Sequence, residues 1–490
     1  MSPAHHRSQR RWPVLLVAAA VMAGLGVAAT SPGTARPGAP PVAPGALVTA
    51  ADAESSAWYC TGQSTPTGQV AVGSLVLTNT TSRAVSGRVS AVTDTAASAT
   101  IALTVPARGQ LVTSSPPTAS GTWVSQVVTL DGGGVAVSQF VHGPSGWSEA
   151  PCQSGTSQQW YFPSGATSGS NVLYLSLFNP TSTSDVVDLS FATPSGLTRP
   201  INYQGLVVKP GQTLVENVGS YVQEQPSVAT TVSTRTGRVV ASELQVLAIK
   251  GNGLAILPGS PRTDVEWVVP QSLEIPGGSS DIDVFNPGST TEVVTVRVHL
   301  SSGGQTTPFS VHVLPGTVWV LATSAQTRIP VGDAYSAALT ATGGPGVVMG
   351  RVVSAPAGSP SPQSGMANAI DSLSAASPTK EWVVPSPGTA ASPAAPGVIP
   401  AHLALANEGT STESYTVSAL TRNGRHTVAS GTLDASSFAS VGDVLLFDSG
   451  LNPFLVTASG PMAVSEDVGP TGAYGVVTMP GIPVAAPLDG

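Results

Sequence analysis

Charged residues are scarce in this chain. Asp, Glu, Lys and Arg make up only 9% of its 490 residues, and the formal net charge is −8, whereas about a quarter of the residues in an ordinary soluble domain are charged. A nucleic-acid-binding surface needs concentrated Lys and Arg to displace counterions from phosphates, and the 19 basic residues here are scattered along the sequence. We therefore expect no nucleic-acid partner.

Metal-ligating residues are also few. The seven histidines show no His-Glu-x-x-His pattern or other ligand spacing. His299 and His312 fall on neighbouring predicted strands and could meet, but two histidines without a third ligand are typical of a surface pair. Asp281 and Asp283 lie two apart on one strand face, which suits a solvated edge better than a calcium site because no further oxygen ligands are near. We predict no metal and no cofactor.

No arrangement of catalytic residues stands out. The chain lacks a Gly-x-Ser-x-Gly nucleophile elbow. Glu243 and Glu466 occupy the same strand position in different parts of the chain, too far apart for paired glycosidase carboxylates, which work about 5 to 9.5 Å apart. Gln139 and Arg351 hold that position elsewhere, which favours an outward-facing site on the strand. We predict no catalytic residue and a protein that is not an enzyme.

What the chain does have is one short signature that recurs four times. A Trp followed by apolar residues precedes an alternating apolar run that stops at Asn, and the Trp recurs roughly every hundred residues, the size of one β-sandwich domain and too long for a solenoid repeat. The signature residues are Trp58 and Asn79, Trp160 and Asn179, Trp267 and Asn286, and Trp382 and Asn407. Four such units in a row predict a rod.

Within each unit the pattern is that of strands. Apolar residues alternate with period two up to the Asn, whose side chain can bond its own downstream backbone and so end the strand. A second alternating run follows, which predicts a hairpin, and a last Val-rich hairpin closes each unit, as in 124–130 with 135–141. With seven or so strands per unit and almost no helical periodicity, we predict an all-β chain of four tandem immunoglobulin- or fibronectin-like β-sandwich domains.

The predicted organisation follows from these marks and from two Pro-rich stretches. The β-sandwich domains, called repeats 1 to 4 below, are separated by a linker between the third and the fourth and preceded by a tether. The boundaries are 1–30 for a signal peptide or membrane anchor, 31–56 for a Pro/Ala-rich tether, 57–153 for repeat 1, 158–261 for repeat 2, 265–354 for repeat 3, 355–380 for a Ser/Pro/Ala-rich linker and 381–490 for repeat 4.

The N-terminal segment is typical of an export signal. Arg7, Arg10 and Arg11 precede the uncharged apolar stretch 13–29. Val27-Ala28-Ala29 suits cleavage, yet the stretch also approaches the roughly 20 residues of a membrane span, so both a cleaved and a retained form stay open. In either case we expect an extracytoplasmic protein, secreted or anchored to the outer face of the cytoplasmic membrane.

The two cysteines fit that compartment. Cys60 lies two residues after Trp58, and Cys152 lies just beyond the last predicted strand of repeat 1. We predict a disulfide that ties the two ends of repeat 1, worth about 4 to 5 kcal/mol in the chain-entropy model for a loop of roughly 90 residues. Two widely spaced thiols do not favour a metal or redox role.

Taken together, the export signal, the tether and the Trp-led repeats with Leu-Phe-Asn-Pro (177–180) and Val-Val-Ala-Ser-Glu (239–243) resemble an uncharacterised family of exported actinobacterial proteins, over about Ser55 to Pro483. That family has no established activity. Its members are encoded beside cell-envelope glycosyltransferases, so the resemblance implies a role in envelope assembly, with an envelope protein or glycan as partner.

Two functions are therefore open. The first is a non-enzymatic scaffold or interaction protein of the bacterial cell envelope, and the second is a carbohydrate- or cell-wall-binding module. Sugar rings stack on exposed aromatic side chains, but the aromatic residues make up only 5% of the chain and do not recur at one position. The candidates outside the signature are Trp123, Trp147, Trp319, Tyr203, Tyr221 and Tyr335.

Overall fold

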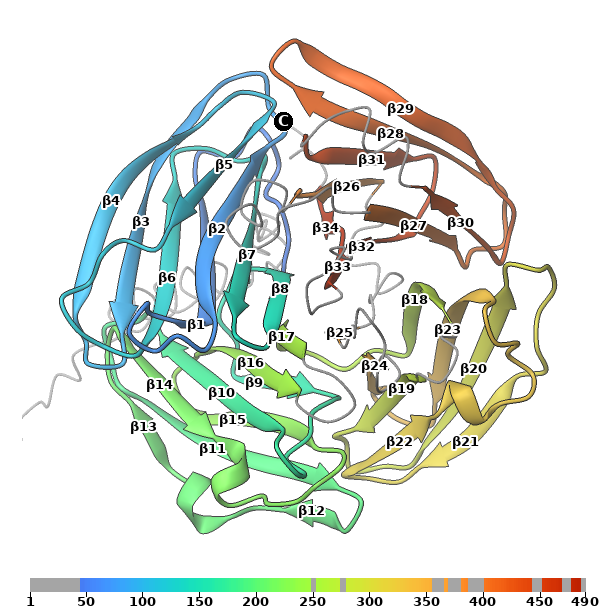
Figure 1. Ribbon diagram of the computed structural model, residues 1–490, viewed down its shortest axis with the longest axis horizontal. Helices are drawn as coiled ribbons and strands as arrows, with labels where there is room; N and C mark the ends of the chain where they lie inside the picture. Colours follow the sequence, from blue (N-terminus) through green and yellow to red (C-terminus); the bar gives the residue numbers. More distant parts are fainter. Residues whose placement is uncertain are drawn as a thin grey trace, which may run out of the picture. The chain divides into compact units, whose positions relative to one another are not determined.

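The structure is a computed structural model, and it describes residues 45–247, 253–273, 279–354, 365–368, 380–386, 401–442, 452–468 and 477–485. The predicted signal segment and the predicted tether up to residue 44 lie outside the described residues, as does most of the predicted linker. In the described part of the chain, every regular element longer than three residues is a β-strand (Figure 1). None of its helices has the length and hydrophobicity that a membrane span requires. The chain is therefore all-β, as predicted.

The strands form seven sheets among the described residues. Repeat 1 holds one eight-stranded sheet in the order β4-β3-β6-β1-β2-β7-β8, with β5 added beside β2. Its strands are β1 (Ser56–Ser64), β2 (Val72–Asn79), β3 (Val85–Thr93), β4 (Ser98–Val105), β5 (Gly109–Ser114), β6 (Trp123–Leu130), β7 (Val135–Gly143) and β8 (Gly146–Pro151). The two halves of this sheet join through a single parallel pairing of β1 with β2.

Repeat 2 has two separate sheets, β14-β10-β16-β17 and β12-β11-β15-β9, with β13 beside β11. Its elements are β9 (Gln159–Phe162), β10 (Val172–Asn179), β11 (Asp185–Thr193), β12 (Gly196–Thr198), η1 (Ile201–Tyr203), β13 (Leu206–Val208), β14 (Gln212–Asn217), η2 (Val218–Ser220), β15 (Ala229–Thr236), β16 (Val240–Leu247) and β17 (Gly253–Pro258).

Repeats 3 and 4 follow the same plan. Their sheets run β18-β23-β20-β21 and β22-β19-β24-β25, then β29-β28-β31-β26-β34 and β30-β27-β32-β33. Repeat 3 and the segment after it hold β18 (Glu266–Leu273), β19 (Ser279–Asn286), β20 (Glu292–Leu300), β21 (Phe309–Val313), β22 (Thr317–Leu321), η3 (Thr323–Ala325), β23 (Ala334–Thr342), β24 (Val348–Ser354) and β25 (Gly365–Asn368). Repeat 4 holds β26 (Glu381–Val384), β27 (Ala401–Asn407), β28 (Glu413–Thr421), β29 (Gly424–Leu433), β30 (Ser437–Val441), β31 (Phe454–Ala458), β32 (Ala463–Val468), β33 (Val477–Pro480) and β34 (Ile482–Pro483).

Side chains from two sheets meet in a shared core, the arrangement of a β-sandwich. In repeat 2, Trp160 of β9 and Leu189 of β11 share one apolar cluster with Leu175 of β10, which belongs to the other sheet. The alternation read from the sequence explains this, because every second residue of each strand faces inward. The four signature Trp side chains are all buried in such cores.

The signature Asn residues brace the turns that follow β2, β10, β19 and β27. Each is fully buried. In repeat 2, Nδ2 of Asn179 donates to the carbonyls of Thr183 and Val208, at 2.7 and 3.0 Å, while Oδ1 accepts from the backbone N–H of Thr181 at 2.8 Å. The same three contacts recur at Asn79, Asn286 and Asn407. The Asn therefore ties the turn to the last residue of a distant strand.

The predicted hairpins are wrong about strand pairing. β2 pairs with β5 and β7, whereas β3, which follows the Asn79 turn, pairs with β4 and β6. β6 and β7 likewise belong to different halves of the sheet. Each of these short turns carries the chain from one layer to the other. Two strands that both point apolar residues inward look alike in sequence whether they pair side by side or face each other.

The prediction of a rod is also wrong. Four strands that each lie at the end of a sheet contact one another in a closed cycle, because β8 contacts β17, β17 contacts β25, β25 contacts β33, and β33 contacts β8. A backbone bridge between Val48 and Val484 joins the two ends of the described chain at the same junction. Repeat 4 therefore packs against repeat 1 instead of lying at a far end.

One strand lies inside the predicted linker 355–380. β25 pairs antiparallel with β24, in the place that β8 and β17 occupy in repeats 1 and 2. The Ser- and Pro-rich composition around it hid this strand from sequence analysis. Residues 355–364 and 369–379 lie outside the described residues.

Candidate functional site

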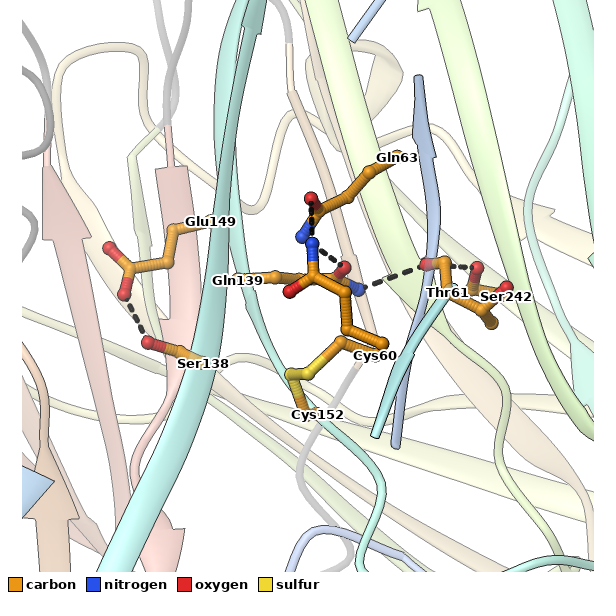
Figure 2. The surroundings of a disulfide bond; sticks show 9 residues. Cys60, Thr61, Gln63, Ser138, Gln139, Glu149, Cys152 and Ser242 are labelled. Atoms are coloured by element: carbon orange, nitrogen blue, oxygen red, sulfur yellow. Dashed lines mark hydrogen bonds between the residues drawn. A yellow bond between two sulfur atoms is a disulfide. The ribbon is translucent and has the colours of Figure 1, made fainter. Parts of the chain in front are cut away.

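The predicted disulfide is present. Cys60 of β1 and Cys152, which follows β8, are bonded across 92 residues with a Cα–Cα distance of 4.8 Å (Figure 2). Both cysteines are buried. Backbone hydrogen bonds between Tyr59 and Gln153, at 2.8 and 2.9 Å, flank the bridge. It therefore fastens the first strand of repeat 1 to the segment that leaves the repeat, as the sequence indicates.

A buried chain of amides lies beside the disulfide. Nε2 of Gln126 donates to Oε1 of Gln63 at 2.9 Å. Nε2 of Gln63 donates to Oε1 of Gln139 at 3.1 Å, and Nε2 of Gln139 donates to the carbonyl of Thr61 at 3.1 Å (Figure 2). Gln139 therefore points into repeat 1. The predicted outward-facing position is wrong here, because its neighbour across the sheet, Leu75, faces the same core.

The hydroxyl of Thr61 connects repeat 1 to repeat 2. Its Oγ1 lies 2.6 Å from Oγ of Ser125 and 2.6 Å from Oγ of Ser176. Thr213 of β14 donates to Ser125 at 2.8 Å, and Ser242 of β16 donates to the carbonyl of Thr61 at 2.7 Å. All five residues are buried. A hydrogen-bonded network of this kind fixes one arrangement of the two repeats, since an unpaired buried hydroxyl is costly.

Gly62 allows the backbones to approach at this junction. Its φ is +96°, and a Cβ there would lie 2.5 Å from Oγ of Ser242 and 3.3 Å from Cδ1 of Ile256. A side chain at this position would both strain the backbone and collide with repeat 2. The position between Cys60 and Gln63 is also where the pairing of β1 with β6 shifts register.

The residues that occupy the position equivalent to Gln139 in repeats 2, 3 and 4 are buried as well. Glu243, Arg351 and Glu466 are 0%, 3% and 2% exposed, so the predicted outward-facing position is wrong for all four. Burial raises the pKa of Glu243 to about 8, which keeps it neutral at pH 7. Each of these residues pairs across its sheet with a core aliphatic residue. They lie inside separate repeats and do not form a carboxylate pair.

Two further buried carboxyls lie on faces between repeats. Glu149 of β8 accepts a hydrogen bond from Ser138 at 2.5 Å, and burial raises its pKa to about 8 (Figure 2). Glu149 shares its strand face with Trp147, whose apolar cluster includes Met479 of repeat 4. Sequence analysis missed Glu149, although it is the one charged residue in the strand Gly146–Pro151.

Asp283 is the second of these carboxyls. It is 5% exposed, so the solvated edge predicted for it is wrong. Burial raises its pKa to about 7, and the nearby Asp281 adds to that rise, while Ser164 of repeat 2 opposes it. In the described part of the chain, no group of three or more His, Cys, Asp or Glu could hold a metal ion.

The predicted histidine pair does not meet. His299 faces repeat 4, where its Nε2 lies 3.6 Å from a carboxylate oxygen of Glu408. His312 pairs across the sheet with Val293, six residues from His299 along β20, a separation of about 20 Å on an extended strand.

Three of the six candidate aromatic residues are not available to a ligand, and Trp123 and Trp319 are half-buried. Trp147, Tyr203 and Tyr335 are buried, while Tyr221 is 53% exposed. Tyr221 lies edge-on to Tyr203 with ring centroids 5.2 Å apart, and the hydroxyl of Tyr203 donates to the carbonyl of Asn217 at 2.5 Å. Tyr221 is thus an exposed ring that packs against a buried, hydrogen-bonded tyrosine.

Comparison with known proteins finds a family model that matches part of the chain. Residues 134–340 match the family described as "Family of unknown function (DUF5719)". The match is consistent with the resemblance to an uncharacterised family. It covers the end of repeat 1, all of repeat 2 and most of repeat 3. No curated protein matches the chain.

Two solved structures show limited likeness. "Crystal Structure of Thermotoga maritima 1070" is 16% identical with a TM-score of 0.20, covering 22% of this chain and 94% of that one. "Crystal structure of tetra-tandem repeat in extending region of large adhesion protein" is 12% identical with a TM-score of 0.12, covering 87% of this chain and 98% of that one. At these TM-scores, neither likeness bears on fold or function.

Proposed function

We propose that this protein is a non-enzymatic, extracytoplasmic scaffold or interaction protein of the bacterial cell envelope, built from four immunoglobulin-like β-sandwich domains. In this proposal the N-terminal segment exports the chain and either is cleaved or stays as a single membrane anchor. The partner is an envelope protein or glycan. The proposed role is in envelope glycan assembly, as the resemblance to the exported actinobacterial family implies.

The observation that carries the proposal is the buried polar network at the contact between repeats 1 and 2, together with the contacts that follow it from repeat to repeat. Thr61, Ser176 and Thr213 bond one another or a shared partner across the first junction, and the contacts continue from repeat to repeat until they return to repeat 1. Such a body holds its parts in fixed relation, which suits the presentation of loops and sheet edges to a partner. The disulfide adds stability that is available in an oxidising compartment.

Fractionation of cells that express the full chain, with N-terminal sequencing of the recovered protein, tests the location. The proposal expects the protein in the envelope or the medium, with the N-terminus either intact or cut near Ala29. Recovery of an uncleaved chain in the cytosol alone would overturn it.

Binding to isolated envelopes tests the role. We expect saturable co-sedimentation of the full chain with the envelopes. Pretreatment of the envelopes with protease or with glycan-degrading enzymes then identifies whether the partner is protein or glycan. Absence of saturable binding would contradict a scaffold that acts on envelope components.

A second candidate is a carbohydrate- or cell-wall-binding module, and the exposed ring of Tyr221 favours it. The ring of Tyr203 packs edge-on against that ring. Sugar rings stack on aromatic faces that are held in a fixed orientation. A glycan panel tests this function, with Tyr221→Ala expected to abolish binding and Ile201→Ala, at an exposed aliphatic residue, expected to preserve it. Equal binding by both variants would remove the support that Tyr221 gives.

A further inference from the structure

β4 is an edge strand without the features that usually protect such an edge. It lies at the end of its sheet, and among the described strands it pairs with β3 alone. The eight residues Ser98–Val105 include no charged residue, proline or glycine. The pairing with β3 runs without a bulge from Val85 to Val92. An extended strand of this kind exposes a row of backbone donors and acceptors to another chain.

The corresponding edges of the other repeats are each interrupted or charged. In repeat 2 the edge is split into β12 and β13, of three residues each, with η1 and Pro200 between them. In repeat 3 the edge strand β21 has only five residues, follows Pro308 and contains His312. In repeat 4 the edge strand β29 carries Arg425 and His426, and its pairing with β28 shifts register. These are known ways of preventing edge-to-edge pairing.

The side chains of β4 are suited to pairing with an identical strand. Ser98, Thr100, Ala102 and Thr104 are exposed on one face, whereas Ile101 and Leu103 are half-buried against the core of repeat 1. A two-fold axis perpendicular to the sheet would place exposed residues opposite exposed residues and half-buried opposite half-buried. Threonine pairs across strands are favourable, and no like charges would face each other.

We propose that β4 of one molecule pairs antiparallel with β4 of a second copy of this chain, which forms a symmetric dimer with one continuous sheet across the interface. The uncharged ladder favours a second copy over a charged peptide, because a charged peptide would find no ion-pair partner on β4 while an identical strand matches both faces. The pairing also covers the outer parts of Ile101 and Leu103.

Sedimentation of the full chain over a range of concentrations tests the proposal. We expect a monomer–dimer equilibrium whose dissociation constant rises at least about tenfold in Thr100→Lys, since the two new lysines would lie close together across the two-fold axis. The matched control is Ser430→Lys, at an exposed position on the edge strand β29, which should leave the equilibrium unchanged.

Circular dichroism and thermal unfolding of both variants establish that they fold. A folded Thr100→Lys variant that dimerises as well as the parent would overturn the proposal, as would a parent chain that stays monomeric at every concentration. A dimer that Ser430→Lys disrupts and Thr100→Lys does not would place the interface elsewhere and would overturn it too.

Discussion

The junction between repeats 1 and 2 and the junction between repeats 3 and 4 use opposite chemistry. The first is built around the hydroxyls of Thr61, Ser125 and Ser176. The second is a small apolar cluster that includes Val268, Ala338, Ala406 and Ala463, with His299 near Glu408 at its side. Corresponding strands supply both contacts, since β10 and β27 each end at a signature Asn.

The position three residues before that Asn shows the difference directly. It is occupied by Val76, Ser176, Asp283 and Ala404, all of them buried. The Asn itself keeps the same three hydrogen bonds in every repeat. The repeats therefore share the signature Asn and its contacts, whereas each junction has its own residues. A different repeat placed beside repeat 1 would leave the hydroxyls of the first junction unpaired, so this junction favours repeat 2 as the neighbour.

The largest expected effect comes from removing a shared brace. Asn179→Ala deletes the buried side chain that donates to the carbonyls of Thr183 and Val208 and accepts from the backbone N–H of Thr181. We expect a loss of roughly 3 to 5 kcal/mol in the free energy of unfolding, measured by urea denaturation, with the exposed Gln223→Ala as control. If Asn179→Ala lowered the free energy of unfolding by less than the junction variants do, the shared Asn would not be more important for stability than the individual junctions.

The dependence of stability on pH reports on buried carboxyls, of which Glu149 lies at a junction and Glu243 lies inside repeat 2. In the folded protein Glu149 and Glu243 have a pKa of about 8, whereas an unfolded Glu titrates near 4.3. The folded state thus binds more protons between these values, so the stability that these two carboxyls contribute is fully present below about pH 4 and is lost as the pH rises to about 8. Thermal unfolding from pH 5 to pH 9 should show this decline.

Glu149→Gln isolates the carboxyl at the face shared by repeats 1 and 4. Between pH 5 and pH 9, the free energy of unfolding of this variant should fall by roughly 3 to 5 kcal/mol less than that of the parent protein. Glu54→Gln, at an exposed position, should follow the parent protein. A parent whose melting temperature rises from pH 5 to pH 9 would contradict the sign of the effect.

A moderate effect is expected at the apolar junction. Ala406 is fully buried beside Val268 and Ala338, so Ala406→Leu should overpack the contact and lower the free energy of unfolding by about 1 to 3 kcal/mol. Differential scanning calorimetry is the measurement, with Ala435→Leu at an exposed turn position of repeat 4 as control. If Ala406→Leu left the free energy of unfolding unchanged, the junction would have room for the larger side chain.

The smallest effect is expected at the hydroxyl junction. Thr61→Val keeps the shape of the side chain and removes the hydroxyl that bridges Ser125 and Ser176. We expect a cost of about 1 to 2 kcal/mol, because the two serines lose one partner. In a double-mutant cycle, Ser176→Ala should add less in the Thr61→Val background than in the parent. Strict additivity would show that the bond does not couple the repeats.

Sequence analysis could predict the strands and the buried signature residues because these follow from short periodic patterns. It could not predict which strands pair, since β2 and β3 both carry inward apolar residues whether or not they lie in one sheet. It also missed the contacts between repeats. Thr61, Ser176 and Thr213 are residue types that commonly lie on solvent-facing strands, and nothing local shows that a second repeat covers them.

The candidate site shows the same limit. The Cys60–Cys152 bond was predictable because the two residues mark the ends of one repeat. The position of Glu243 was not, because a carboxyl in an alternating strand is normally assigned to the solvent face. Its burial depends on the pairing with Leu175, which is a property of register and cannot be read from one strand alone.

The bridge between Val48 and Val484 has a consequence for protein engineering. Because these two residues are neighbours, a short peptide could join them, and new ends could be opened elsewhere, for instance in the turn between β12 and η1. Such a circular permutant would keep every contact described here while beginning in repeat 2. Any fused reporter could then be moved from one side of the molecule to another without rebuilding its interior.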